Sequence, residues 1–239
     1  MSDRFSRTEN LIGKDAMNKL KNARVAVFGA GGVGGYCLEA LARSGVGAID
    51  VIDNDTVAES NINRQIFALN STIGKYKVDV AKERISDINP DCKVTAYKLF
   101  YLPETADEID LSQFDYIVDA IDTVAAKLCL IERANDLGVK IISAMGAGNK
   151  LEPTAFKVAD IYKTSGCPLA RVIRTECKKR GIKSLKVAYS EEKAIKPISG
   201  TEECAKGKRS VPASISFVPS VAGLIIAGEV IKDLIKGEN

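Results

Sequence analysis

A glycine-rich turn after an apolar strand limits the folds that this chain can adopt. The run 29–34 follows the apolar segment 25–28 and contains Gly29, Gly31, Gly32 and Gly34. Glycines in this context let the backbone approach a phosphate, and the following helix offers its N-terminal amides to the anion. The pattern predicts a strand, a nucleotide-binding turn and a helix, but it does not distinguish NAD, FAD, S-adenosylmethionine and ATP.

Strand and helix patterns alternate along the first 145 residues. We expect strands at 25–28, 48–52, 93–99, 116–120 and 140–144, and helices at 34–43, 75–88 and 124–137. Such alternation is typical of a Rossmann-like, doubly wound α/β fold with a mostly parallel sheet. A helix at 8–20 precedes these elements. The less regular last third suggests strands near 156–161 and 185–189, a helix near 168–180, and a C-terminal helix.

The chain of 239 residues shows no linker or repeat. We therefore expect a single domain over 1–239, with a nucleotide-binding core at about 22–150 and an elaborated, substrate-facing part at about 151–239. The most apolar stretch, 215–231, is short and contains Pro219 and Glu229, which favours a buried helix over a membrane span. The polar N-terminus carries no export signal, so a cytoplasmic location with reduced thiols is expected.

Polar side chains follow the second predicted strand, at the sheet edge where such folds bind ligands. Asp53 ends that strand, where a ribose hydroxyl requires an acceptor. Arg64 follows in a polar run, where it could clamp phosphates through paired hydrogen bonds. The same stretch contributes further candidate nucleotide contacts, namely Asp55, Ser60, Asn61 and Gln65. This cluster places an arginine, amides and carboxylates beside the nucleotide.

Two more charged residues extend the cluster. Lys77, in the next helix, adds a second positive charge, and Asp122, just past strand 116–120, offers a carboxylate to Mg²⁺. Cleavage of ATP at its α-phosphate calls for such groups, because charge accumulates on the phosphorus and on pyrophosphate. A nicotinamide-dependent oxidoreductase is the alternative from another class, but it would leave Arg64, Lys77 and Asp122 without a role.

Composition excludes several chemistries. The chain has no histidine, so a Ser-His-Asp or Cys-His device is impossible. Its six cysteines include no pair at C-x-x-C spacing, which argues against a structural zinc site.

Positive charge is concentrated in one segment. Residues 171–209 hold twelve Lys or Arg against five Glu, a net of +7, whereas the remainder of the chain carries −4. In the predicted helix, Arg171, Arg174 and Lys178 lie along one ridge. The segment is suited to a polyanion such as RNA, although a solvated basic surface explains the charge alone equally well.

These motifs together resemble the ATP-binding core of the ubiquitin-activating-like enzymes, a family that includes adenylyltransferases of molybdopterin and thiamine sulfur carriers. The matching runs are Gly-Ala-Gly-Gly-Val-Gly at 29–34, Asp53-x-Asp55, Ser60-Asn61-x-x-Arg64-Gln65, Gly74-Lys75-Tyr76-Lys77 and Asp119-Ala-Ile-Asp122. The resemblance implies that Asp53 binds ribose, that Arg64 and Lys77 neutralise phosphates, and that Asp122 binds Mg²⁺.

The resemblance also implies a homodimer. Arg7 is similar to the family arginine that reaches into the neighbouring subunit's site, although Arg4 competes for that role. We expect Arg7 to act in catalysis from the partner subunit, together with Arg64, Lys77 and Asp122.

Within the family, the whole chain is similar to the branch that dehydrates threonylcarbamoyladenosine in tRNA. The similarity lies in Arg4-Phe5 and in the runs 45–48, 89–90, 146–148, 160–161 and 168–170. It implies ATP-dependent cyclisation of that nucleoside through adenylation of its carboxylate, with tRNA as the partner and a possible sulfur-transfer or helper protein.

One departure from the branch and one alternative function bear on this reading. The branch often has a cysteine before the C-terminal helix, but here Ser210-Val-Pro-Ala-Ser214 occupies that region and Cys204 is the nearest thiol. Adenylation of the C-terminal glycine of a ubiquitin-like sulfur carrier is the second alternative. The absence of C-x-x-C pairs counts against it.

Overall fold

The computed structural model describes residues 4–198 and 212–236. Within these residues, seven strands form one sheet in the order β3-β2-β1-β4-β5-β7-β6. Neighbouring strands run parallel except at one edge, where β6 is antiparallel to β7. The bounds are β1 Arg24–Phe28, β2 Ala48–Ile52, β3 Lys93–Tyr97, β4 Tyr116–Asp119, β5 Lys140–Ala144, β6 Phe156–Asp160 and β7 Lys186–Ser190. The predicted doubly wound, mostly parallel α/β fold is confirmed.

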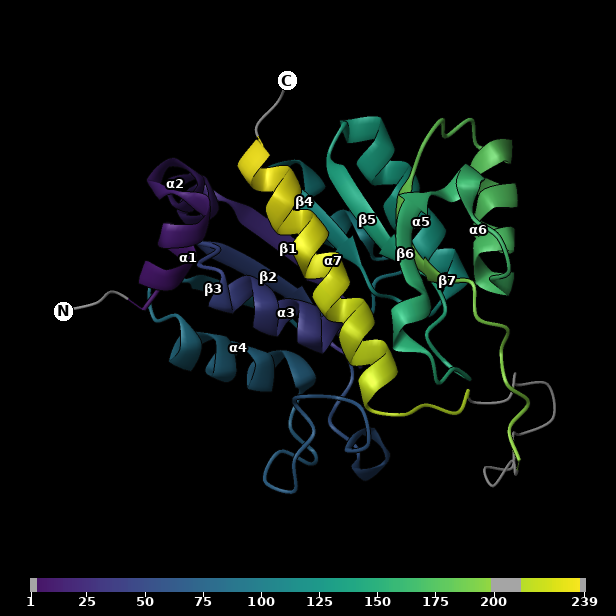
Figure 1. Cartoon of the computed structure of the whole chain (residues 1–239), viewed down its shortest axis with the longest axis horizontal. Coiled ribbons are helices and arrows are strands. Elements are labelled where there is room, and N and C mark those ends of the chain that lie inside the picture. The colour runs from purple at the N-terminus through teal and green to yellow at the C-terminus, as the bar shows by residue number, and fades with distance from the viewer. Residues whose placement is uncertain (1–3, 199–211, 237–239) are drawn as a thin grey trace.

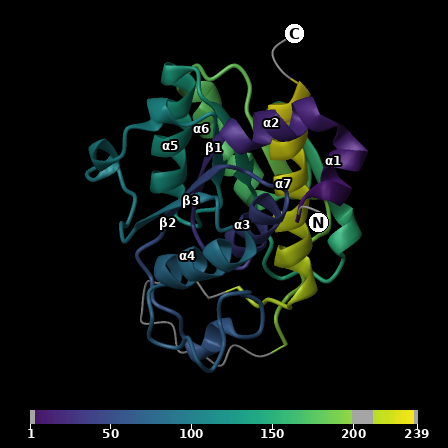
Figure 2. The same ribbon diagram turned by 90° about the vertical axis from the view of Figure 1, so that its left-hand side faces the viewer.

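Helices cover both faces of this sheet (Figures 1 and 2). α3, α4 and α7 lie on one face, and α5 and α6 lie on the other. The bounds are α1 Ser6–Ile12, α2 Lys14–Asn22, α3 Gly34–Arg43, α4 Lys77–Ile88, α5 Val124–Leu137, α6 Pro168–Lys179 and α7 Phe217–Lys236. Central strands covered on both sides are buried along most of their length, which explains their continuous apolar runs.

The two faces of β1 belong to two apolar cores. Val25 and Val27 join the core beneath α3, α4 and α7, whereas Ala26 and Phe28 join the core beneath α5. The chain passes from β1 into α3 on one face and from β4 into α5 on the other. Because β1 and β4 are neighbours, their following loops diverge and leave a crevice at the carboxyl ends of the strands.

Three predicted elements differ from the observed ones by two residues or more, and the other boundaries agree to within one residue. The helix expected at 8–20 is divided into α1 and α2 at Gly13, whose φ of 86° favours glycine. The strand expected at 93–99 ends at Tyr97. The helix expected at 75–88 begins at Lys77, because Tyr76 forms an isolated bridge with Thr56.

The apolar C-terminal stretch forms α7, a buried helix, as predicted. α7 crosses α3 so closely that a Cβ on Gly223 would lie 2.2 Å from the Val33 carbonyl oxygen. None of the described helices is both long and apolar enough to span a bilayer.

Candidate active site

A cavity of about 740 Å³ lies at the carboxyl ends of β1, β2 and β4. Its lining comes from the loops after five strands, so residues distant in sequence meet there. The predicted site residues that it brings together are Gly29, Gly31, Gly32, Asp53, Asp55, Asn61, Arg64, Gln65, Lys77 and Asp122. Ser60, Gly34 and Arg7 do not line it.

The glycines of the first loop divide into two roles. Gly29 has φ of 95°, and a Cβ there would lie 2.6 Å from the Ala120 carbonyl oxygen; a Cβ on Gly34 would lie 1.8 Å from the Gly29 oxygen. These two close the turn between β1 and α3, so Gly34 packs the helix rather than lining the cavity. A Cβ on Gly31 would instead meet only Gln65 Nε2, at 4.0 Å. Gly31 therefore keeps cavity space open, as a phosphate cradle requires.

Asp53 holds the floor of the cavity together. Its carboxylate accepts hydrogen bonds from the backbone amides of Ala30, at 2.7 Å, and Asp55, at 2.8 Å. It thereby ties the glycine turn to the end of β2. A carboxylate has about four lone-pair positions, so Asp53 retains capacity for a ribose hydroxyl.

Arg64 is held at the cavity by its own loop. Its guanidinium donates to the Ser60 carbonyl at 2.9 Å and to Asn63 Oδ1 at 2.8 Å. Ser60, predicted to contact the nucleotide, thus positions Arg64 through its backbone. The neighbouring Gln65 is buried and lines the cavity, and its Oε1 has no hydrogen-bond partner among the described residues. Such an orphaned polar atom fits a site built for a polar ligand.

Lys77 and Asp55 form an ion pair of 2.7 Å at the cavity. The Lys77 side chain is 6% exposed and the Asp55 side chain is 61% exposed. The ammonium is thus largely desolvated beside a carboxylate that solvent reaches. A phosphate entering the cavity can compete with that carboxylate for Lys77.

Two aspartates of one short run lie in opposite surroundings. Asp122 is exposed and accepts only a 3.4 Å hydrogen bond from the Thr123 hydroxyl among the described residues. Asp119 is buried and accepts hydrogen bonds from Lys127 Nζ at 2.7 Å and the Ser143 hydroxyl at 2.5 Å. Asp122 therefore remains the candidate Mg²⁺ ligand. Asp119 is sealed, in the sense that neither solvent nor a ligand reaches its carboxylate.

The described residues contain no group of three or more His, Cys, Asp or Glu side chains that could hold a metal ion. A cage made only of protein ligands is therefore absent from that part of the chain. Mg²⁺ commonly binds through one or two carboxylates together with substrate phosphates. Asp122 at the rim of the cavity fits that mode.

The comparisons with known proteins decide the family. The ThiF family model matches residues 5–239. The chain belongs to the ThiF family. A tRNA threonylcarbamoyladenosine dehydratase of Bacillus subtilis (strain 168) is 46% identical to it over 244 residues, which cover 99% of this chain and 96% of that protein. The predicted family resemblance is confirmed.

A solved structure agrees with this assignment. The crystal structure of E. coli tRNA N6-threonylcarbamoyladenosine dehydratase in complex with ATP matches with a TM-score of 0.87 and 32% identity, covering 98% of this chain and 94% of that one. A relative with a different name matches less of both chains. The adenylyltransferase and sulfurtransferase UBA4 of Vanderwaltozyma polyspora is 37% identical over 59% of this chain and 32% of its own length.

In this ThiF-family chain, Gly148, Pro212 and Ser214 also line the cavity, although none of them was predicted as a site residue. Asn149, at φ of 58°, exchanges two hydrogen bonds of 2.7 Å with Ala213. Gly148 allows this approach, because a Cβ there would lie 2.6 Å from Pro212 Cβ. Gly146-Ala-Gly148 was visible in the sequence, but its partner segment lies more than sixty residues away. Only the fold brings them together.

None of the five described cysteines of this ThiF-family chain lines the cavity. Burial raises the pKa of Cys92 and of Cys177 to about 11, and it raises the pKa of Cys37 further. These thiols are poor nucleophiles at neutral pH, because the thiolate is the reactive form. Cys204 lies outside the described residues.

The two candidate arginines near the N-terminus lie away from the cavity of their own chain. Arg4 donates to the Ile88 carbonyl at 2.7 Å, at the C-terminus of α4. Arg7 lies exposed on α1 and forms no hydrogen bond or ion pair with another described residue. Arg4 is therefore engaged within its own chain, whereas Arg7 is accessible to a partner.

Proposed function

We propose that this chain is an ATP-dependent tRNA threonylcarbamoyladenosine dehydratase. The observation that carries the proposal is the joint placement of Arg64, Lys77 and Asp122 around one cavity behind a glycine turn. A dinucleotide-dependent hydride transfer would not need that set. Similarity over nearly the whole chain to the B. subtilis dehydratase, and to an ATP-bound E. coli dehydratase, supports the same choice.

The first step activates a poor electrophile. A carboxylate oxygen of the threonyl group attacks the α-phosphorus of ATP, the bond to pyrophosphate breaks, and an acyl-AMP anhydride forms. Arg64 and Lys77 stabilise the negative charge that develops on the phosphates. Asp122 would hold Mg²⁺, which supplies further charge neutralisation at the phosphates. Asp53 would orient the ribose.

The second step closes a ring. The carbamoyl group of the same nucleoside attacks the activated carbonyl carbon and loses a proton to solvent, and AMP leaves with one former carboxylate oxygen. Because the nucleophile is tethered to the electrophile, positioning supplies much of the rate and no covalent enzyme intermediate is required. The absence of any described cysteine from the cavity accords with this route.

Binding of tRNA would involve the basic segment 171–209, of which 199–209 lies outside the described residues. One member of the predicted ridge has a different role. Arg174 donates to the Thr164 carbonyl at 2.9 Å and to its hydroxyl at 2.6 Å, so it anchors a loop beneath α6. Arg171 and Lys178 are exposed and remain the phosphate-facing candidates of this helix.

We also propose that the active unit is a homodimer in the cytoplasm, where tRNA is available. The exposed Arg7 of one subunit would act at the cavity of the other. Residues 22–150 would supply the ATP site and residues 151–239 the surface that meets tRNA, within one domain. A helper protein that accepts or supplies intermediates is compatible with this arrangement.

The test uses the full chain with ATP, Mg²⁺ and bulk tRNA that carries threonylcarbamoyladenosine. After digestion, mass spectrometry should detect a nucleoside lighter by one water, formed only with ATP and accompanied by pyrophosphate. Arg64→Ala provides the inactive control. Pyrophosphate release that requires a small protein carrier instead of tRNA would overturn the proposal.

A further inference from the structure

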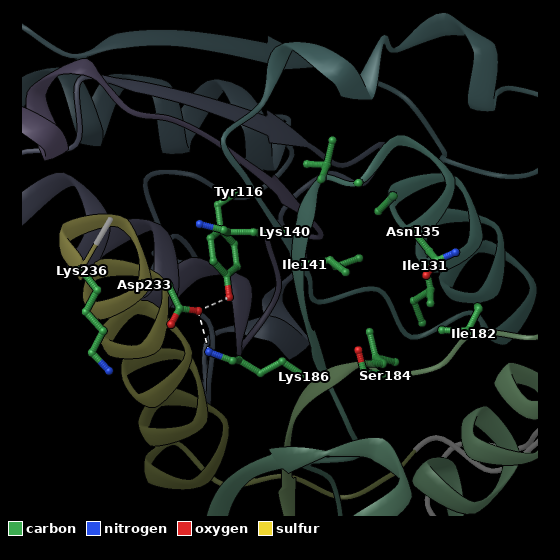
Figure 3. A pocket seen from close by; sticks show the side chains of 14 residues that line it. Tyr116, Ile131, Asn135, Lys140, Ile141, Ile182, Ser184, Lys186, Asp233 and Lys236 are labelled. Atoms are coloured by element: carbon green, nitrogen blue, oxygen red, sulfur yellow. Dashed lines mark hydrogen bonds and ion pairs between the residues drawn. The ribbon is translucent and has the colours of Figure 1, made fainter. Parts of the chain in front are cut away.

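A second cavity, of about 470 Å³, lies at the amino ends of the strands, whereas the nucleotide cavity lies at their carboxyl ends. Its lining includes Tyr116, Lys140 and Lys186, the first residues of β4, β5 and β7 (Figure 3). α7 contributes Asp233 and Lys236. The two cavities are separated by the length of a strand, roughly 15 Å. The proposed adenylation does not use this second cavity.

The cavity carries an excess of positive charge. Among the described residues that line it, the charged side chains are three lysines, Lys140, Lys186 and Lys236, and one carboxylate, Asp233. Figure 3 shows Asp233 directed toward Tyr116 and Lys186. The carboxylate accepts hydrogen bonds from the Tyr116 hydroxyl at 2.7 Å and from Lys186 Nζ at 2.5 Å.

The Asp233 carboxylate is thus already engaged as a hydrogen-bond acceptor. Burial favours its neutral form, but the hydrogen bonds from Lys186 and Tyr116 and the nearby charge of Lys140 lower its pKa overall. Asp233 is therefore ionised at neutral pH and fixes the position of Lys186. Lys186 also lies 3.8 Å from a carboxylate oxygen of Glu229, so this lysine has two acidic partners.

Lys140 and Lys236 form no hydrogen bond or ion pair with any other described residue. The lining also includes the polar side chains of Ser184 and Asn135 and the apolar side chains of Ile141 and Leu185. The lining therefore offers neutral polar groups and two lysines that form no ion pair among the described residues. Ammonium groups of this kind can contact the oxygens of a phosphate.

We propose that this second cavity binds a phosphate group. Lysine binds phosphate as a point charge without the planar geometry of an arginine–carboxylate pair. The exposed Lys183, between the lining residues Ile182 and Ser184, adds a further positive charge beside the cavity. A backbone phosphate of tRNA is the source that this added charge favours, and in that respect the inference rests on the proposed function. Free phosphate has the same chemistry.

The test compares two double variants with the same loss of charge. Lys140→Gln with Lys236→Gln removes the two lysines of the cavity that form no ion pair, and Lys14→Gln with Lys82→Gln removes two exposed lysines elsewhere. The affinity of each protein for tRNA is measured across a range of salt concentrations. Loss of one phosphate contact should reduce the slope of log K against log salt by about 0.7–0.9, and the control should keep the wild-type slope.

A second measurement uses inorganic phosphate and the unmodified chain. The rate at which an amine-reactive reagent acylates each lysine is followed by mass spectrometry. The site predicts that phosphate protects Lys140 and Lys236 but not Lys14 and Lys82. Protection with an unchanged tRNA slope would assign the site to free phosphate and remove the RNA source. An unchanged slope without protection would overturn the site altogether.

The tRNA-affinity and lysine-protection measurements distinguish failure of this inference from failure of the proposed function. A wild-type chain that does not bind tRNA at any salt concentration would contradict the proposed function, while the protection experiment still decides the phosphate site. Conversely, a working dehydratase whose Lys140 and Lys236 show neither protection nor a slope change retains its proposed activity and lacks this site.

Discussion

Two lysine–aspartate pairs at the carboxyl edge of the sheet have the same length and different surroundings. Lys77 Nζ and Lys127 Nζ each lie 2.7 Å from their partner carboxylate, of Asp55 and Asp119 respectively. The Asp55 side chain is 61% exposed, whereas both members of the second pair are fully buried. Lys127 also donates to the Ala144 carbonyl at 2.9 Å, and so links the ends of β4 and β5.

The difference shows that contact distance alone does not assign a role. A pair that faces the cavity can exchange its carboxylate for a phosphate, because water and ligand reach it. A sealed pair cannot exchange, because separation would leave charges buried without partners. We therefore assign the first pair to nucleotide binding and the second to holding the loop that carries Asp122.

The largest expected effect tests the sealed pair. Lys127→Met leaves the Asp119 carboxylate buried beside Ser143 without its cation. We expect it to lower the free energy of unfolding by about 3–5 kcal/mol, measured by urea denaturation. Adding Asp119→Leu should restore much of the loss, because the buried charge disappears. A single variant as stable as wild type would show that the pair is not structural.

For the pair Lys77–Asp55, which faces the cavity, we expect a loss of activity with little loss of stability. Lys77→Met should reduce the rate of pyrophosphate formation by on the order of a hundred-fold or more, because a phosphate-neutralising charge is lost. Its urea midpoint should stay close to wild type, since Asp55 remains solvated. Lys75→Met, two residues away and exposed, is the matched control. Near-normal turnover in the folded Lys77 variant would remove Lys77 from the mechanism.

Asp122→Asn tests the carboxylate that the sealed pair positions. We expect roughly ten-fold lower activity at limiting Mg²⁺, since a neutral amide is a poorer ligand for a hard cation. Excess Mg²⁺ should restore part of it. A Mg²⁺ dependence identical to that of wild type would exclude Asp122 as the ligand and leave Asp55 as the remaining candidate, because Asp119 is sealed.

The smallest expected effect on activity comes from replacing Asp55, the exposed partner of Lys77. Asp55→Asn removes the charge that holds Lys77 but leaves Lys77 in place. We expect the rate of pyrophosphate formation at saturating ATP to fall only a few-fold, because an exposed ion pair contributes little. The KM for ATP should decrease, since the cavity becomes more positive. A hundred-fold loss would mean that Asp55 acts directly in the reaction.

The sequence could predict the elements and motifs that depend on local pattern. The glycine turn, Asp53, Arg64, Lys77 and the alternating strands follow from short-range spacing, and the structure gathers those side chains at one cavity. The sequence favoured Asp122 over Asp119 as the Mg²⁺ ligand, but it could not show that Asp119 is buried in an ion pair, because Lys127 and Ser143 meet Asp119 only in the folded sheet.

Other differences have the same physical origin. Gly34 belongs to the same motif as Gly31, but it is required because α3 begins in close contact with the Gly29 carbonyl oxygen. Arg174 shares a helical ridge with Lys178, but Thr164, ten residues earlier, accepts its hydrogen bonds. The sequence did not predict the second cavity, because the lysines that line it come from separate elements.

The central claim is that the cavity activates a carboxylate by transferring AMP to it. The direct measurement supplies tRNA whose threonylcarbamoyladenosine carboxylate is labelled with ¹⁸O, and follows the label through one turnover by mass spectrometry. Attack on the α-phosphorus predicts one ¹⁸O atom in the phosphate of AMP, and pyrophosphate without label. Label in orthophosphate, released together with ADP, would show attack at the γ-phosphorus and contradict the account.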